Sequence, residues 1–111
     1  MKELLDEFST KLSERGIISK QILFTLQSFF PSLDENGECS ISMKNLTDHR
    51  TKVSMEKCIW ATPVTEQVIV RHIKKLEDLL PEYFSVIRCR KAYRNVNRYI
   101  FDLKNIEEDF G

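Results

Sequence analysis

Two prolines, Pro63 and Pro81, bound the stretch of this sequence that most constrains its fold. Between them apolar side chains recur every three or four residues, which is the period of an amphipathic helix. Thr62 can cap this helix and Pro63 suits its first position, because the N–H that proline lacks would be unpaired there anyway. We expect the core face of the helix to consist of Val70, Ile73, Leu76 and Leu80.

Two β-like runs follow this helix. Residues 83–90 (YFSVIRCR) are rich in β-branched and aromatic side chains, and residues 98–103 (RYIFDL) place Tyr99, Phe101 and Leu103 on one side. The segment between them contains Asn95 and Asn97, which tolerate turn conformations. We therefore expect a β-hairpin with a basic tip.

The rest of the chain predicts further helices. Residues 2–13 carry an apolar stripe that ends before Gly16, a left-handed helix stop. This stripe predicts core packing or, alternatively, a homodimer contact; it consists of Leu4, Leu5, Phe8 and Leu12. A second helix is expected from the N-cap Ser19 to Phe30. Residues 40–43 predict a short strand or extended segment and residues 43–50 a short helix. Residues 51–62 fit either a short helix or a packed loop, and the acidic tail, residues 104–111, is expected to fray.

Length and composition limit the class of protein. The chain has 111 residues, which fits a single domain, and 41% of them are hydrophobic, which argues against intrinsic disorder. No run approaches about 18 consecutive apolar residues, so no membrane span is expected. Acids inside the apolar pattern of MKELLDEF do not fit a signal peptide. Three cysteines without a Cys-x-x-Cys pair then predict a reduced, cytoplasmic environment.

No motif in the sequence predicts catalysis. The chain lacks a nucleophile elbow and a His-Glu-x-x-His motif, and its three glycines do not form a nucleotide-binding loop. The intervals from Cys39 to His49 and from Cys58 to His72 do not match compact zinc-ligand spacings. We therefore expect no enzyme activity, no cofactor and no metal.

The net charge of zero conceals an uneven distribution. Residues 71–104 carry nine basic and four acidic side chains, whereas residues 1–38 and 105–111 each have a net charge of −3. No acid occurs from Ser85 to Phe101. Arginines clustered on a hairpin can follow a phosphate backbone, where counterion release drives binding. The alternative is that these cations keep the hairpin soluble and its edge unpaired.

Two segments together resemble the recognition helix and wing of winged helix-turn-helix DNA-binding proteins. They are residues 64–79 (VTEQVIVRHIKKLEDL) and residues 83–103, and they are similar in style to replication initiators and transcription regulators of bacteria, plasmids and phages. The wing pattern closes on the Asn-Arg-Tyr run at residues 97–99. The helix pattern rests on Val70, Arg71, Ile73, Lys74, Lys75 and Leu76.

The resemblance implies an α+β fold, a mostly helical winged helix-turn-helix with a C-terminal β-hairpin wing. Residues 1–111 would form one domain, with an N-terminal helical part (1–38), a helix-turn-helix part (39–80), the wing (83–103) and the acidic tail. In this architecture the second helix of the motif enters the major groove. The expected DNA-binding residues are Gln67, Arg71, Lys75, Arg88, Arg90, Lys91, Tyr93, Arg94 and Arg98.

Two functions follow as hypotheses. The first is binding of double-stranded DNA by a small transcription regulator or replication-type factor of a bacterium or mobile element. The second is a non-catalytic protein-interaction module on the same scaffold, such as a phage or mobile-element inhibitor of a host nucleic-acid machine. The acidic ends of the chain and its zero net charge motivate the second hypothesis.

Overall fold

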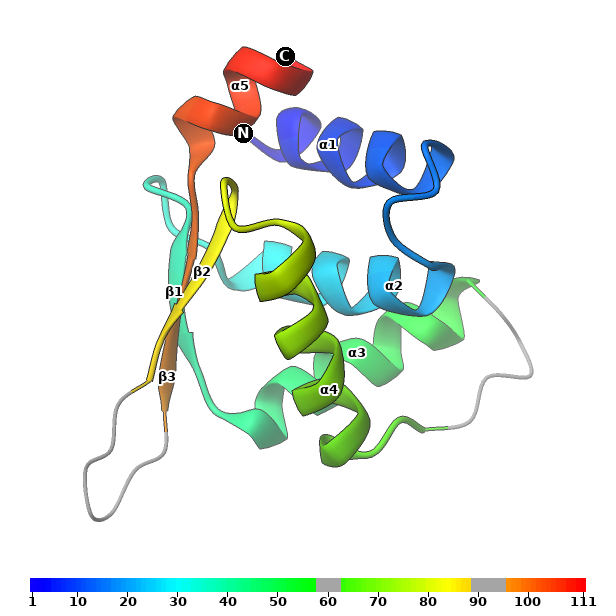
Figure 1. Cartoon of the computed structure of the whole chain (residues 1–111). Coiled ribbons are helices and arrows are strands. Elements are labelled where there is room, and N and C mark those ends of the chain that lie inside the picture. Colours follow the sequence, from blue (N-terminus) through cyan, green and yellow to red (C-terminus); the bar gives the residue numbers. More distant parts are fainter. Residues whose placement is uncertain (58–62, 89–95) are drawn as a thin grey trace.

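The computed structural model describes residues 1–57, 63–88 and 96–111 (Figure 1). These residues form an α+β fold in which helix predominates over strand, in agreement with the predicted class. None of the helices in these ranges is both long and apolar enough to cross a membrane. The elements are, in order, α1 (Lys2–Glu14), α2 (Lys20–Phe29), the 3-10 turn η1 (Phe30–Ser32), β1 (Glu38–Ile41), α3 (Met43–Lys57), α4 (Glu66–Leu79), β2 (Phe84–Ile87), β3 (Asn97–Phe101) and α5 (Leu103–Phe110).

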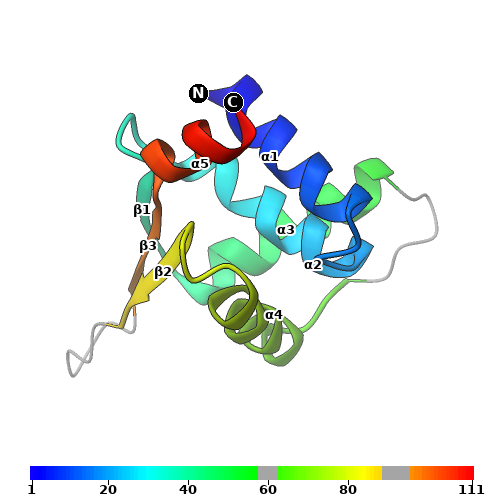
Figure 2. The ribbon, with the colours of Figure 1, turned by 45° about the horizontal axis from the view of Figure 1, so that its top comes forward.

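The sheet has the strand order β1–β3–β2, and both pairs are antiparallel. Its register aligns Cys39, Tyr99 and Val86 across the three strands. Cys39 and Tyr99 are buried, whereas their neighbours Ser40 and Arg98 are exposed, because successive side chains of a strand point to opposite faces. Helices α2, α3 and α4 lie on one side of the sheet in both views (Figures 1 and 2). The sheet therefore has a core face and an outer face, and Arg98 lies on the outer one.

An aromatic cluster joins α2 to the hairpin formed by β2 and β3. The ring centroid of Phe29 lies 4.7 Å from that of Tyr99, 5.7 Å from that of Phe84 and 5.9 Å from that of Phe101. All four side chains are buried, and such ring pairs stabilise by about 0.5–1.5 kcal/mol beyond the area that they bury. The predicted pairing of two strands is thus confirmed, with Tyr99 and Phe101 on the apolar side. Leu103, predicted on the same side of the strand, instead begins α5, and residues 89–95 of the predicted basic tip lie outside the described residues.

The first two helices follow their predicted bounds closely. Gly16 lies just after the end of α1 and has a left-handed φ of 71°. The Ser19 Oγ caps α2 by accepting a hydrogen bond from the Ile22 N–H at 3.3 Å. The apolar stripe of α1 is buried inside the chain's own core, in agreement with the core prediction; its fully buried members are Leu5, Phe8 and Leu12.

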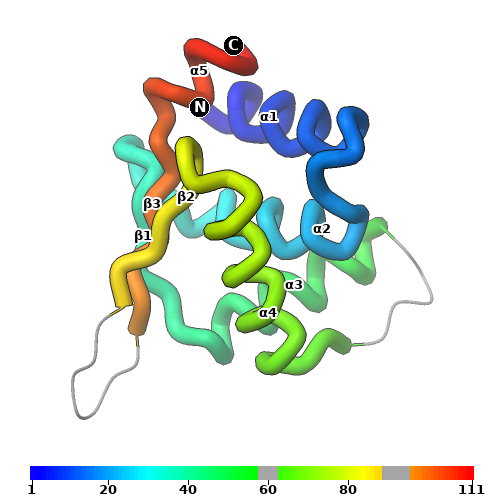
Figure 3. Tube along the Cα trace, in the orientation of Figure 1, coloured from blue at the N-terminus to red at the C-terminus, as the bar shows by residue number. Residues whose placement is uncertain are grey.

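The predicted fraying of the acidic tail is wrong, because the tail forms α5. The Asp102 carboxylate caps this helix by accepting a hydrogen bond from the Asn105 N–H at 3.1 Å. Ile106 and Phe110, one turn apart, are buried, and the Phe110 ring centroid lies 5.0 Å from that of Phe8 in α1. The two ends of the chain therefore lie beside each other (Figure 3). Two apolar side chains among several acids are enough to dock α5 on α1, because a short helix needs to bury only one narrow stripe.

The predicted short helix over residues 43–50 is also wrong in extent, because α3 continues to Lys57. Its buried side chains are Leu46, Arg50 and Ser54, spaced one turn apart. Two of these three are polar, so the helical period does not show in the hydrophobic pattern.

The strands differ from their predicted bounds by a few residues. β1 begins at Glu38, two residues before the predicted segment, and pairs with β3. Gly37 precedes it with a φ of 78°, and a Cβ there would lie 2.7 Å from the Phe101 carbonyl oxygen. Glycine is therefore required where this turn meets the end of β3.

Helix α4 begins later than predicted. Thr65 caps it by accepting a hydrogen bond from the Val68 N–H at 3.4 Å, and Pro63 precedes the helix. The predicted cap, Thr62, lies outside the described residues. The predicted core position of Val70 is wrong, since its side chain is 43% exposed and Ile69 is buried in its place. The buried stripe is Ile69, Ile73 and Leu76, continued by Leu80.

Candidate nucleic-acid interface

The outer face of α4 carries a stripe of exposed residues. Because Ile69, Ile73 and Leu76 turn inward, the opposite side carries residues three and four apart that all face solvent. Two of them, Gln67 and Arg71, were predicted as DNA contacts, whereas Val70 and Lys74 were not. The helical periodicity would have placed Val70 and Lys74 on the exposed side if Ile69, and not Val70, had been taken as the core position. The outer stripe consists of Gln67, Val70, Arg71, Lys74 and Asp78.

Beside this stripe, α4 and the start of α2 enclose a hollow of about 280 Å³, which we call the α2–α4 hollow. Two cations of α4, Arg71 and Lys75, and the imidazole of His72 line it, and no carboxylate does. Among the residues that the structure describes, neither Arg71 nor Lys75 forms an ion pair. The residues that line the hollow are Ser19, Ile22, Val68, Arg71, His72 and Lys75.

His72 connects this hollow to the protein interior. Its Nδ1 lies 2.6 Å from the Thr25 Oγ1 of α2, and its side chain is half-buried. Burial lowers the pKa of His72, and the nearby positive charges of Arg50, Arg71 and Lys75 lower it further. The imidazole is therefore held neutral by an environment that contributes only positive charge.

A buried arginine lies behind His72. Arg50 is fully buried, and its guanidinium donates to Thr25 Oγ1 at 2.9 Å, to Gln21 Oε1 at 2.9 Å and to Ser54 Oγ. It also stacks over the Phe24 ring, 5.4 Å from the centroid. All of its hydrogen-bond acceptors are neutral, and desolvation lowers its pKa. Buried charges are usually paired with an opposite charge, so this one is unusual.

Sequence reasoning missed the contribution of Ser19, Thr25 and Arg50. Thr25 and His72 are 47 residues apart, and nothing in their local patterns relates them. Arg50 lies at a position where helical periodicity would have required an apolar residue. Tertiary packing alone brings these groups together.

The arginines at the base of the hairpin are neutralised by the chain itself. Arg88 makes a two-pronged ion pair with Glu77 of α4, with Nη1 and Oε2 3.1 Å apart, and this hydrogen bonding raises the Arg88 pKa. Arg98, on the outer face of the sheet, pairs with Glu38 of β1 with Nε and Oε1 2.9 Å apart. Arg88 is thus held beside α4, whereas Arg98 lies on the sheet face turned away from the helices. The predicted contacts Arg90, Lys91, Tyr93 and Arg94 lie outside the described residues.

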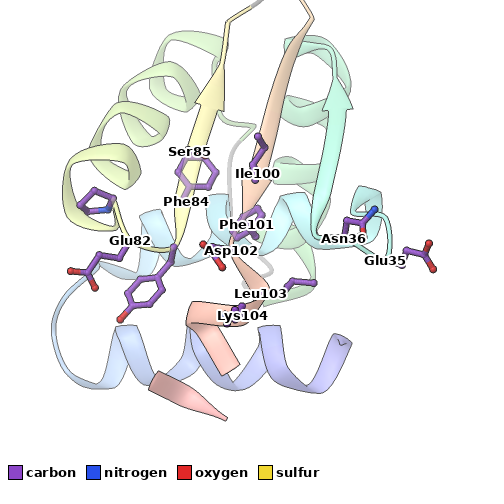
Figure 4. A pocket seen from close by; sticks show the side chains of 12 residues that line it. Glu35, Asn36, Glu82, Phe84, Ser85, Ile100, Phe101, Asp102, Leu103 and Lys104 are labelled. Atoms are coloured by element: carbon purple, nitrogen blue, oxygen red, sulfur yellow. The ribbon is translucent and has the colours of Figure 1, made fainter. Parts of the chain in front are cut away.

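A second hollow, of about 450 Å³, lies at the end of the sheet that is next to α5 (Figure 4). Exposed carboxylates of three segments line it, from Glu35, Glu82 and Asp102, together with Lys104. Acids therefore predominate around this second hollow, whereas cations line the α2–α4 hollow without a carboxylate.

The α2–α4 hollow and the outer stripe of α4 offer charged donors that suit the oxygens of a phosphate. Within the described ranges, no group of three or more histidine, cysteine, aspartate or glutamate side chains is arranged to hold a metal ion. No family model, curated protein or solved structure matches this chain.

Proposed function

We propose that the chain is a DNA-binding protein with a winged helix-turn-helix fold, a small transcription regulator or replication-type factor of a bacterium or mobile element. Helices α3 and α4 would be the two helices of the motif, and the hairpin of β2 and β3 would be the wing. Helix α4 would then lie in the major groove, as the second helix of such motifs does.

The order of the elements supports this fold. A helix is followed by a connection, a capped helix with a polar outer face and a hairpin, and the hairpin pairs with the earlier strand β1 through β3. The Arg88–Glu77 ion pair ties the base of the hairpin to α4. These two elements therefore form one surface that could follow one groove and its backbone.

The observation that carries the proposed function is the exposed outer stripe of α4. Glutamine can read adenine, arginine can read guanine, and an apolar side chain can contact the methyl group of thymine. Gln67 and Val70 offer the first and third of these chemistries, and Arg71 can contact either a base edge or a phosphate; all three are exposed. Lys74 and Lys75 add positive charge for the phosphates that flank the bases.

A fluorescence-polarisation titration against duplex DNA at about 50 and 200 mM salt tests this function. We expect binding that weakens steeply as salt rises. Replacing Arg71→Ala together with Lys75→Ala should weaken binding and lower the slope of log K against log salt by about 1 for each lost phosphate contact. Arg90→Ala with Arg94→Ala should weaken binding across all sequences in the same way.

The matched control is Lys2→Ala with Lys104→Ala, which removes the same charge from exposed positions at the α1–α5 end. This pair should leave the salt slope unchanged. The absence of DNA binding at low salt would contradict the proposed function. So would an equal loss of DNA affinity in the Arg71/Lys75 variant and in the Lys2/Lys104 control.

One observation favours the second candidate, a protein-interaction module. Two hairpin arginines are neutralised within the chain, and the hollow beside α5 is acidic. A basic protein partner would then bind the α5 end. Formation of a stoichiometric complex with a protein, weakened by Glu35→Gln with Glu82→Gln and combined with no DNA binding, would favour this candidate.

A further inference from the structure

We propose that the α2–α4 hollow binds a backbone phosphate of DNA and that protonation of His72 strengthens this contact. The inference rests on the proposed DNA-binding function and adds to it a specific phosphate site and a dependence on pH. It assigns a role to His72, a residue that was not among the predicted contacts.

Three titratable side chains of α4 converge on the hollow. Arg71 and Lys75 are four residues apart, so they lie on the same side of α4, and His72 lies between them in sequence. Like charges at this spacing destabilise a helix by a few tenths of a kcal/mol when nothing neutralises them. A phosphate in the hollow would neutralise both. The Ser19 end of α2 also lines the hollow, and the helix dipole favours an anion at that end.

The buried charge of Arg50 lies behind the hollow. Arg50 is joined to His72 through one atom, the Thr25 Oγ1, which lies 2.9 Å from Arg50 Nε and 2.6 Å from His72 Nδ1. The acceptors of Arg50 are all neutral, so its charge is left without a counter-ion inside the described part of the fold. Electrostatic attraction is weakly screened through the protein interior. A phosphate at His72 would therefore be attracted by Arg50 as well as by the two cations on the surface.

The Thr25 hydroxyl can accommodate either protonation state of His72. A hydroxyl has one proton and two acceptor sites. Arg50 Nε donates to one acceptor site, and when His72 is neutral the Thr25 proton can be donated to His72 Nδ1. When His72 is protonated, Nδ1–H becomes a donor to Thr25, and the hydroxyl proton can turn to the Gln21 carbonyl oxygen at 3.3 Å. Nε2 then carries a proton in both states and is available to the phosphate.

The sign of the pH dependence follows from linkage. Without phosphate, burial and the cations Arg50, Arg71 and Lys75 disfavour the protonated imidazole. A bound phosphate favours it, so the pKa of His72 is higher in the complex than in the free protein. Binding must then take up a proton and become tighter as the pH falls. The affinity gain is about tenfold for each unit by which DNA raises the His72 pKa.

NMR titration of the two histidine rings in the full chain tests the inference between about pH 5 and 8, the range in which histidine titrates. The pKa of His72 is measured in the free protein, with sulfate and with a short duplex DNA. Sulfate serves as the inorganic oxyanion because its charge does not change in this range. We expect both ligands to raise the pKa of His72, whereas the His49 ring, which lines a different hollow, should show no ligand-dependent change. The His49→Gln variant assigns the resonances and serves as the matched control.

A second measurement follows DNA affinity against pH in His72→Gln. We expect this variant to bind DNA with an affinity that no longer rises as the pH falls, while His49→Gln retains the dependence. DNA binding with an unchanged His72 pKa would overturn the inference and leave the proposed function intact. A His72 pKa raised by sulfate in a chain that binds no DNA would support an oxyanion site and overturn the proposed function. No rise with either ligand would overturn the site itself.

Discussion

The two ends of this molecule use their side chains differently. Beside α5, the rings of Phe8, Tyr83 and Phe110 form a closed cluster, with centroids 5.0–5.4 Å apart for each pair. Beside the α2–α4 hollow, Arg71, His72 and Lys75 surround a space that no carboxylate enters. The first end is an arrangement for packing, and the second leaves charges that a ligand can satisfy.

The polar groups show the same difference. At the α5 end Lys11 pairs with Glu7 at 3.0 Å and donates to the Phe110 carbonyl at 3.2 Å, and Tyr83 donates to Asp109. This last hydrogen bond is the main reason that the pKa of Tyr83 rises to about 12. At the other end Arg50 is buried among neutral acceptors. A buried cation with only neutral hydrogen-bond acceptors therefore lies behind the hollow at which we expect a negatively charged ligand.

The largest effect that we expect is on the free energy of unfolding, at the α5 end. Phe8→Ala should lower the free energy of unfolding by about 3–5 kcal/mol, because Phe8 is fully buried between α1 and α5. Denaturant unfolding measures the change. Leu79→Ala, at an exposed position of α4, should change stability by no more than about 0.5 kcal/mol.

If Phe8→Ala does not fold, Phe8→Leu provides a milder variant for the same measurement. Its DNA affinity should equal that of the wild type, since the α5 end lies outside the proposed interface. A loss of less than about 1 kcal/mol in the alanine variant would show that the α1–α5 contact contributes little.

A smaller effect concerns pH and the opposite end. The His72 pKa is lowered in the folded chain, so the unfolded chain binds the proton more readily. This contribution to stability is fully present above about pH 6.5, the unfolded value, and is lost as the pH falls towards the folded pKa. Denaturation midpoints measured against pH should show a decline that His72→Gln removes and His49→Gln retains. Parallel curves for wild type and His72→Gln would contradict the described environment of His72.

The smallest effect tests the hairpin base. Glu77→Gln breaks the exposed ion pair with Arg88, and such pairs contribute about 0–1 kcal/mol, so thermal unfolding should change little. DNA affinity, measured by the same polarisation titration, should rise by a few-fold, because Arg88 becomes free to contact phosphate. An unchanged or lower affinity would indicate that the pair is needed to hold the hairpin beside α4.

The sequence predicted the elements whose apolar pattern is regular. Helices α1 and α2, the hairpin and the core positions Ile73 and Leu76 all follow from periodicity. The extension of α3 could not be predicted, because Arg50 and Ser54 occupy buried positions that are usually apolar. Helix α5 was missed because its burial depends on α1, at the other end of the chain.

The candidate site divides in the same way. Arg71 and Lys75 could be identified from charge and helical spacing, since both lie on the polar side of one helix. The α2–α4 hollow could not, because tertiary packing alone brings Ser19 to its lining and Thr25 to the His72 ring behind it. Local patterns thus indicated Arg71 and Lys75, whereas only the tertiary fold brings the neutral side chains of α2 close to them.

Mapping of backbone-amide NMR shifts during titration with duplex DNA shows which helix contacts the DNA. If α4 is the DNA-binding helix, the largest shifts will fall on residues 66–79, on the first turn of α2 and on the hairpin, while α1 and α5 stay unchanged. Shifts concentrated on α1 and α5, or no shifts at low salt, would contradict the account.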